Sequence, residues 1–327
     1  MSSSDRLFVI HAGTHKTATS YIQNRIKLNK NQLGAAEVYI EYPKSDARKH
    51  KPLAEALKAK EWNIWRHYLN SIPSSTSCVF VSAEQFTQPL AGPEVFTRLV
   101  RLLGKHGFQL RIVVFLRDQP DYINARFVHS TRRLYHYLGF EEYVEQQLRE
   151  QRHIFDYNHL FANLLACSDL ETCFLPFRSG LGDPFERLMQ SQGWTTSTPW
   201  EPADPSQGNI QPGIRGVWLA QEVARRLDQN EVHPSVFKNK SAAIRNIAER
   251  EGWTTERYYG FTSELQAHVT EHYANANDQF SQQVWGKPWR DVFPLQQPQR
   301  RVYSLPEDKE ERKKMMVFVD EAMSKLS

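Results

Sequence analysis

The chain has 327 residues, of which 40% are hydrophobic, and its 41 Lys and Arg against 37 Asp and Glu give a formal net charge of +4 at pH 7. So small a positive charge suits an anionic ligand but gives no reason to expect a nucleic-acid partner. The first residues are polar and no apolar run is long enough to cross a bilayer, so we expect neither a signal peptide nor a membrane span. We therefore expect a cytoplasmic protein.

The first predicted element is a short buried strand at Leu7–Ile10, followed after Gly13 by a helix. Three apolar residues share one face of that helix, Ile22, Ile26 and Leu33. A strand, a glycine-bearing turn and a helix start direct unpaired backbone N–H groups and the positive end of the helix dipole to one spot. Such a spot binds phosphate or sulfate.

Side chains around this turn strengthen the prediction of an anion site. Lys16 adds a positive charge, and Thr17, Thr19 and Ser20 add hydroxyl donors. An ordinary turn with a Ser or Thr cap is the alternative, but a cap needs only one hydroxyl and no lysine. The triphosphate P-loop, G-x-x-x-x-G-K-[ST], does not match, because His15 stands where a glycine precedes the lysine.

The second predicted strand, Cys78–Ser82, is followed by Glu84. Glu84 is therefore expected at the ligand-binding edge of the sheet, as a candidate general base. A carboxylate that caps the next helix is the alternative. His15, His129 and His136 compete for the role of base, because the ordinary pKa of histidine is about 6.5.

A helix is predicted over Glu94–Leu103 and a buried strand over Leu110–Leu116. That strand ends in Arg117, and Pro120 lies in the first turn of another helix. Open α/β sheets bind ligands at the carboxyl ends of their strands, so Arg117 is a candidate anion ligand. A surface arginine that merely ends a strand is the alternative.

The second half of the chain predicts one more strand, Thr172–Phe177, and two long active-site loops, Phe127–Phe140 and Pro199–Asn209. A helical stripe near the end is expected to pack on the chain's own domain, with a homodimer contact as the alternative; it consists of Met315, Val319, Ala322, Met323 and Leu326. Three cysteines without metal-ligand spacing are expected to be buried, reduced thiols, namely Cys78, Cys167 and Cys173.

Strands that alternate with helices predict an α/β fold with a mostly parallel central sheet covered by helices on both faces. We expect a single α/β domain over residues 1–300, with a helical region on the acceptor side at about residues 185–290. Residues 301–327 are expected to form a C-terminal tail and helix.

The turn after the first strand resembles the 5′-phosphosulfate loop of sulfotransferases that use 3′-phosphoadenosine 5′-phosphosulfate, in the form typical of the bacterial branch. His11 precedes the matching run and Gln23 follows it; the run itself is Gly13, Thr14, His15, Lys16, Thr17, Ala18, Thr19 and Ser20. The resemblance implies a fold like the three-layer sandwich of P-loop nucleoside triphosphatases. It also implies that these loop residues bind the donor.

The resemblance further implies that Arg117 grips the 3′-phosphate together with a serine eight residues later. Ala125 stands at that position, so Asn124 or Ser130 is expected to substitute. Arg178, just beyond the last predicted strand, is implied to lie near the adenine.

The implied reaction is in-line transfer of a sulfuryl group to a hydroxyl or amine of a carbohydrate or small-molecule metabolite, with release of adenosine 3′,5′-bisphosphate. Lys16, Glu84 and His15 are the expected catalytic residues, and no metal is required, because a sulfuryl group carries less charge than a phosphoryl group. The alternatives are a small-molecule kinase that uses ATP and magnesium, and a non-catalytic nucleotide-binding module of the same fold.

Overall fold

The computed structural model describes residues 6–43, 49–150, 152–168, 170–204, 211–229 and 242–326, and it divides into two compact units. The sheet unit takes Met1–Asp118, Asp156–Gly208 and Ala276–Phe293. The helical unit takes Gln119–Phe155, Asn209–Asn275 and Pro294–Ser327. The extent of the single domain expected over residues 1–300 stays a prediction.

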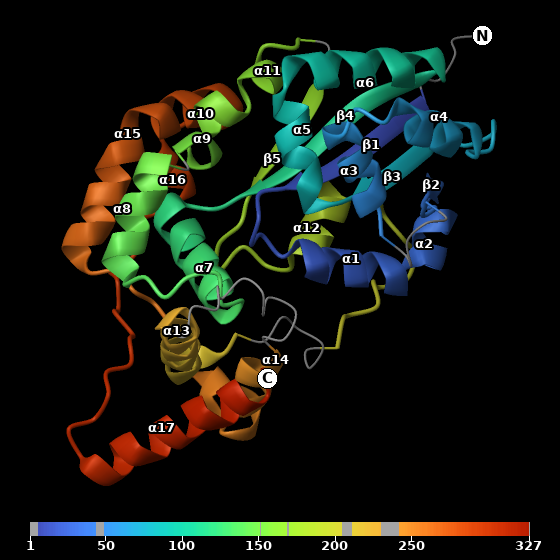
Figure 1. Ribbon diagram of the computed structural model, residues 1–327. Helices are drawn as coiled ribbons and strands as arrows, with labels where there is room; N and C mark the ends of the chain where they lie inside the picture. The colour runs from blue at the N-terminus through green and yellow to red at the C-terminus, as the bar shows by residue number, and fades with distance from the viewer. Residues whose placement is uncertain are drawn as a thin grey trace. The chain divides into compact units, whose positions relative to one another are not determined.

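A five-stranded parallel sheet forms the centre of the sheet unit (Figure 1). Its strand order is β2-β3-β1-β4-β5, and its strands are β1 (Arg6–Gly13), β2 (Val38–Tyr39), β3 (Cys78–Ser82), β4 (Phe108–Leu116) and β5 (Glu171–Pro176). All four pairings are parallel, which confirms the predicted α/β class and parallel sheet. The sequence does not predict β2, because two residues are too few to show strand alternation.

One face of the sheet is covered by α1 (Thr19–Leu28), α2 (Lys30–Ala35) and α12 (Pro184–Ser191). Because successive strand residues point to opposite faces, Val9 faces these helices and Phe8 does not. The predicted apolar face of the first helical segment is confirmed, since Ile22, Ile26 and Leu33 are buried in the same cluster as Val9.

Helices also cover the opposite face (Figure 1). They are α3 (Lys51–Lys58), α4 (Trp62–Asn70), the short 3-10 helix η1 (Glu84–Phe86), α5 (Thr87–Ala91) and α6 (Pro93–Lys105). The ring of Phe8 lies 5.9 Å from that of Trp65 in α4 and 5.7 Å from that of Phe108. The predicted helix Glu94–Leu103 is confirmed as the greater part of α6.

Beside β5, the same face is covered by α10 (Tyr157–Leu160), α11 (Ala162–Leu165), the last part of α15 (Ser263–Trp285) and α16 (Trp289–Val292). Phe174 of β5 packs between Phe161, which joins α10 to α11, and Phe280 of α15, with ring distances of 5.1 Å and 5.0 Å. The indole N–H of Trp285 donates to the carbonyl of Phe174. These contacts attach the end of α15 to the strand next to β4.

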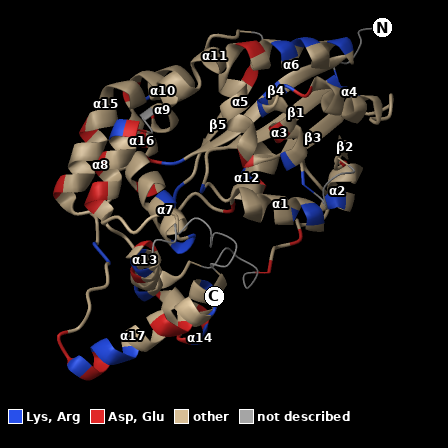
Figure 2. Cartoon of the chain, in the orientation of Figure 1, with Lys and Arg blue, Asp and Glu red and all other residues tan. Residues whose placement is uncertain are grey.

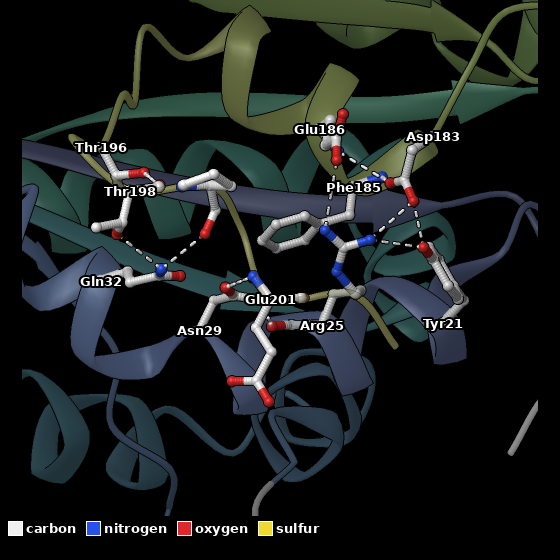
Figure 3. A network of polar contacts seen from close by, with 11 residues as sticks. Tyr21, Arg25, Asn29, Gln32, Asp183, Phe185, Glu186, Thr196, Thr198 and Glu201 are labelled. Atoms are coloured by element: carbon white, nitrogen blue, oxygen red, sulfur yellow. Dashed lines mark hydrogen bonds and ion pairs between the residues drawn. The ribbon is translucent and has the colours of Figure 1, made fainter. Parts of the chain in front are cut away.

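A buried ion pair connects α1 to α12 (Figure 3). The Arg25 side chain is 2% exposed, and its Nη1 donates to Asp183 over 2.8 Å and to the Tyr21 hydroxyl over 2.7 Å. The other oxygen of Asp183 accepts from the backbone N–H groups of Phe185 and Glu186, so it caps α12. One carboxylate therefore holds both the helix after β1 and the helix after β5.

The start of the predicted loop Pro199–Asn209 is attached to Asn29, which lies between α1 and α2, and to Gln32 of α2 (Figure 3). Asn29 accepts from the Glu201 backbone N–H over 2.7 Å and donates to the Glu201 carbonyl over 3.0 Å. Gln32 donates to the Pro199 carbonyl. The end of this loop, including Asn209, lies outside the described residues.

The helical unit contains α7 (Gln119–Arg132), α8 (Phe140–Glu150), α9 (Arg152–Phe155), α13 (Gly213–Gln229), α14 (Ala242–Arg250), η4 (Trp253–Thr255), the first part of α15 and α17 (Lys309–Ser324). The terminal stripe packs on this unit as predicted: Met315, Val319 and Ala322 are buried in one cluster with residues of α13 and α14. Acidic and basic residues are mixed at the start of α17 (Figure 2).

The expectation of a loop over Phe127–Phe140 is wrong in its first part. Helix α7 continues to Arg132, because Phe127, Val128 and Thr131 bury one side of the helix. Aromatic and charged residues in this stretch conceal that helical face in the sequence.

Among the helices of the described ranges, none combines the length and apolar character that crossing a bilayer requires. Cys78, Cys167 and Cys173 are free and partly buried. Burial raises the pKa of the Cys78 thiol to about 11, so it is protonated at neutral pH.

Replacement of Asp183 by alanine should lower the free energy of unfolding by about 3 kcal/mol, because it leaves a buried guanidinium without its main partner and α12 without its cap. Urea unfolding measures this change. Glu186→Gln is the matched control: Glu186 is 59% exposed and lies 3.6 Å from Arg25, so its loss should change stability by less than about 1 kcal/mol. Equal effects of the two substitutions would contradict the assigned role of Asp183.

Candidate active site at the carboxyl ends of β1, β3 and β4

The turn between β1 and α1 contains two non-glycine residues in the left-handed backbone conformation. Lys16 has φ 69° and Ala18 has φ 61°. This conformation costs about 1–2 kcal/mol for a residue with a Cβ atom, and such strain gathers at binding sites. Turns that contain left-handed residues direct successive backbone N–H groups into a concave surface that binds anions.

Gly13 gives this turn the space that it needs. A Cβ atom at Gly13 would lie 2.7 Å from Thr19 Oγ1 and 3.3 Å from Thr17 Oγ1, so any larger residue would displace both hydroxyls. The turn is also bonded to itself and to the sheet. Thr17 donates to the Thr14 carbonyl over 2.6 Å, and Thr14 donates to the Phe115 carbonyl over 3.1 Å.

The start of α1 has the features of an anion-binding helix terminus. Its N-cap residue is Ala18, which has no side-chain acceptor for the first N–H groups, and its first turn carries no acidic residue. Thr19 is 4% exposed, and its hydroxyl has no hydrogen-bond partner among the described residues. A buried hydroxyl without a partner is unfavourable, and an anion bound at this helix terminus would supply one.

Glu84 lies beside this turn, as the sequence predicts. It is the first residue of η1, directly after β3, and its Oε1 lies 3.3 Å from His15 Nδ1. The His15 side chain is 43% exposed and that of Glu84 is 31% exposed, so a ligand can reach both. This pair can accept a proton from a bound hydroxyl or amine.

Arg117 and Lys16 meet at the ends of two neighbouring strands. Strands β1 and β4 are paired along their length, and Arg117 follows the last residue of β4. Arg117 Nη1 donates to the Lys16 carbonyl over 3.3 Å, and its guanidinium lies 5.8 Å from the ring of Phe177. Both basic residues therefore belong to one corner of the sheet edge.

Arg178 and Ser20 complete the set of predicted ligands in the sheet unit. Arg178 follows β5, and its Nε donates to the Val292 carbonyl over 2.9 Å. Ser20 is exposed in the first turn of α1. The predicted proximity of Arg178 to an adenine stays a prediction.

Four other predicted residues belong to the helical unit. The amide of Asn124 accepts from the Gly260 N–H and donates to the Tyr258 carbonyl, so one of its two amide hydrogens is already used within the helical unit. Ser130 lies 2.7 Å from His136 Nε2, and burial lowers the pKa of His136 to about 4. His129 lies 3.4 Å from the Arg132 guanidinium.

Two buried histidines lie next to the candidate site. His11 in β1 is fully buried, and its Nδ1 lies 2.8 Å from Ser82 Oγ. The Ser82 backbone N–H donates to Nδ1 of His50, whose Nε2 donates to the Glu41 carbonyl. This pattern requires a neutral His50 with its proton on Nε2. Burial lowers the pKa of both His11 and His50 to about 4.

Sequence reasoning missed the groups that hold the site residues in place. The Tyr157 hydroxyl donates to the Arg117 carbonyl over 2.7 Å, and the Thr87 hydroxyl donates to the Gly13 carbonyl over 2.5 Å. Both partners lie at least 40 positions away in the chain, so no local pattern could identify them.

Comparisons with protein-family models, with curated proteins and with solved structures found no match.

Replacement of Thr19 by valine should leave the free energy of unfolding unchanged or slightly higher, because the lost hydroxyl has no partner in the described part of the protein. Thr17→Val is the matched control and should lower it by about 1 kcal/mol, since it removes the bond to the Thr14 carbonyl. Urea unfolding compares the two variants. A loss in Thr19→Val as large as that in Thr17→Val would show that the Thr19 hydroxyl is already bonded within the protein.

The buried histidines predict a dependence of stability on pH. The unfolded chain binds more protons than the folded protein between pH 6.5 and about 4, because the folded pKa of His11 and His50 is lowered from 6.5 to about 4. Their contribution is complete above pH 6.5 and is lost as the pH falls to about 4, by up to about 1.4 kcal/mol per pH unit for each histidine. Thermal melting by circular dichroism should therefore show a shallower pH dependence for His50→Phe in this range. The exposed His67→Gln should keep the parental dependence, and an unchanged dependence in His50→Phe would contradict the assignment.

Proposed function

We propose that this chain is a sulfotransferase of the bacterial type, with 3′-phosphoadenosine 5′-phosphosulfate as donor and a carbohydrate or small-molecule metabolite as acceptor. The observation that carries the proposal is the corner where Arg117 contacts the backbone of Lys16. It lies next to a helix start without an acidic residue and next to the Thr19 hydroxyl, which has no partner among the residues that the structure describes. In this proposal the sheet unit has the P-loop-like three-layer architecture.

The donor is bound by the two strand ends. The 5′-phosphosulfate accepts hydrogen bonds from the backbone N–H groups of the β1–α1 turn, and the Thr19 hydroxyl donates to one of its oxygens. Lys16 neutralises the charge that develops on the phosphate as the sulfuryl group leaves. Arg117 binds the 3′-phosphate, for which its planar guanidinium is suited.

The transfer is a single in-line displacement. The acceptor oxygen or nitrogen forms a bond to sulfur while the bond from sulfur to the bridging phosphate oxygen breaks, and adenosine 3′,5′-bisphosphate leaves. The His15–Glu84 pair takes the acceptor's proton. Glu84 lies 3.3 Å from His15 Nδ1, so it favours the tautomer with the proton on Nδ1 and leaves the Nε2 lone pair of His15 as the base. Direct proton removal by Glu84 is the alternative route.

Binding of adenosine 3′,5′-bisphosphate, measured by calorimetry, tests the donor site. Lys16→Ala and Arg117→Ala should each weaken binding about 10- to 100-fold, because each removes a charged hydrogen bond to a phosphate. Lys27→Ala removes a lysine from the last turn of the same helix and should bind like the parent. A parent that binds no bisphosphate at millimolar concentration, or two site variants that bind like the parent, would overturn the assignment.

Activity is tested with radiolabelled donor and a panel of carbohydrate, alcohol and amine acceptors. The proposal predicts labelled acceptor and an equal amount of adenosine 3′,5′-bisphosphate. Magnesium-dependent consumption of ATP, together with no binding of the bisphosphate, would instead support the alternative that the protein is a small-molecule kinase. Tight binding of the bisphosphate without transfer to any acceptor would favour a nucleotide-binding module.

A further inference from the structure

The carboxylate of Asp118, next to Arg117, is held by α16. Its Oδ1 accepts from the indole N–H of Trp289 over 2.7 Å, and its Oδ2 accepts from the Arg290 guanidinium over 3.1 Å. The Asp118 side chain is 14% exposed, so this bidentate contact is largely shielded from water. A charge-assisted pair of this kind fixes the orientation of both partners.

The backbone of Arg117 is held by the same group of side chains. The Tyr157 hydroxyl donates to the Arg117 carbonyl, and the Tyr157 ring lies 5.9 Å from the ring of Trp289. Trp289 itself is 1% exposed and lies 4.4 Å from the ring of Phe293. One aromatic block therefore fixes two consecutive residues at the end of β4.

The segment that carries Trp289 also reaches the other arginine that follows a strand. Arg178 donates to the carbonyl of Val292, the last residue of α16. The backbone N–H of Trp289 donates to Asp278 over 2.8 Å, which fixes the start of α16 on the end of α15. Arg178 and the residue that follows Arg117 are thus both attached to one short helix.

We propose that Asp118 is a positioning residue and that α16 is a clamp that fixes the end of β4, and with it Arg117, before the nucleotide arrives; this rests on the proposed function of the sheet unit. A residue whose backbone is already fixed loses less conformational entropy when it binds a phosphate than a residue on a flexible segment. The clamp therefore increases the affinity for the 3′-phosphate without touching it.

Comparison of the binding of two nucleotides distinguishes a positioning role of Asp118 from a general loss of protein stability. Adenosine 3′,5′-bisphosphate carries the 3′-phosphate and adenosine 5′-phosphate does not. Asp118→Asn keeps an oxygen for the indole N–H but removes the charge opposite Arg290. It should weaken binding of the bisphosphate about three- to tenfold and leave binding of the monophosphate unchanged. Arg290→Gln should have the same selective effect. Asp291→Asn, which removes an exposed carboxylate from the same helix, should change neither affinity.

A double-mutant cycle completes the test. In an Arg117→Ala background, Asp118→Asn should have no further effect on bisphosphate binding, because the positioned side chain is already gone. A further loss of the same size, or equal losses for the two nucleotides in the single variants, would overturn the positioning role while the proposed function stands. A parent protein that binds neither nucleotide would overturn the proposed function and the clamp with it.

Discussion

The left-handed turn between β1 and α1 is the constraint on which the rest of the site depends. Lys16 and Ala18 hold a conformation that is unfavourable for residues with a side chain, and it persists only because surrounding contacts enforce it. The bonded hydroxyls of Thr14 and Thr17 enforce it from within, and the absent side chain of Gly13 makes room. The result is a set of backbone N–H groups and a helix terminus directed to one place.

The parallel sheet places the remaining groups around that turn. Because β1 lies between β3 and β4, the residues that follow these two strands lie on either side of the turn, with Glu84 on one side and Arg117 on the other. Asp183 holds the helix that begins at the turn, and Asp118 holds the end of β4. The sheet edge thus brings together two basic groups, a His–Glu pair and the Thr19 hydroxyl, for which the described part of the chain offers no partner.

The sequence predicts the strands that carry the site, because they are short apolar runs, and it predicts the turn from its residue types. It does not predict β2, which is too short, and it mistakes the end of α7 for a loop because aromatic and charged residues mask its buried face. The contacts that position the site are also absent from any local pattern. Arg25 and Asp183 are 158 positions apart, and Asp118 and Trp289 are 171 apart. Only the fold brings these residues together.

A crystal structure with adenosine 3′,5′-bisphosphate bound tests most directly whether the β1–α1 turn and Arg117 bind one nucleotide. We expect the 5′-phosphate on the backbone N–H groups of the β1–α1 turn, within hydrogen-bond distance of Thr19 Oγ1, and the 3′-phosphate on the guanidinium of Arg117. A bisphosphate bound away from this turn, or one whose 3′-phosphate lies far from Arg117, would contradict it.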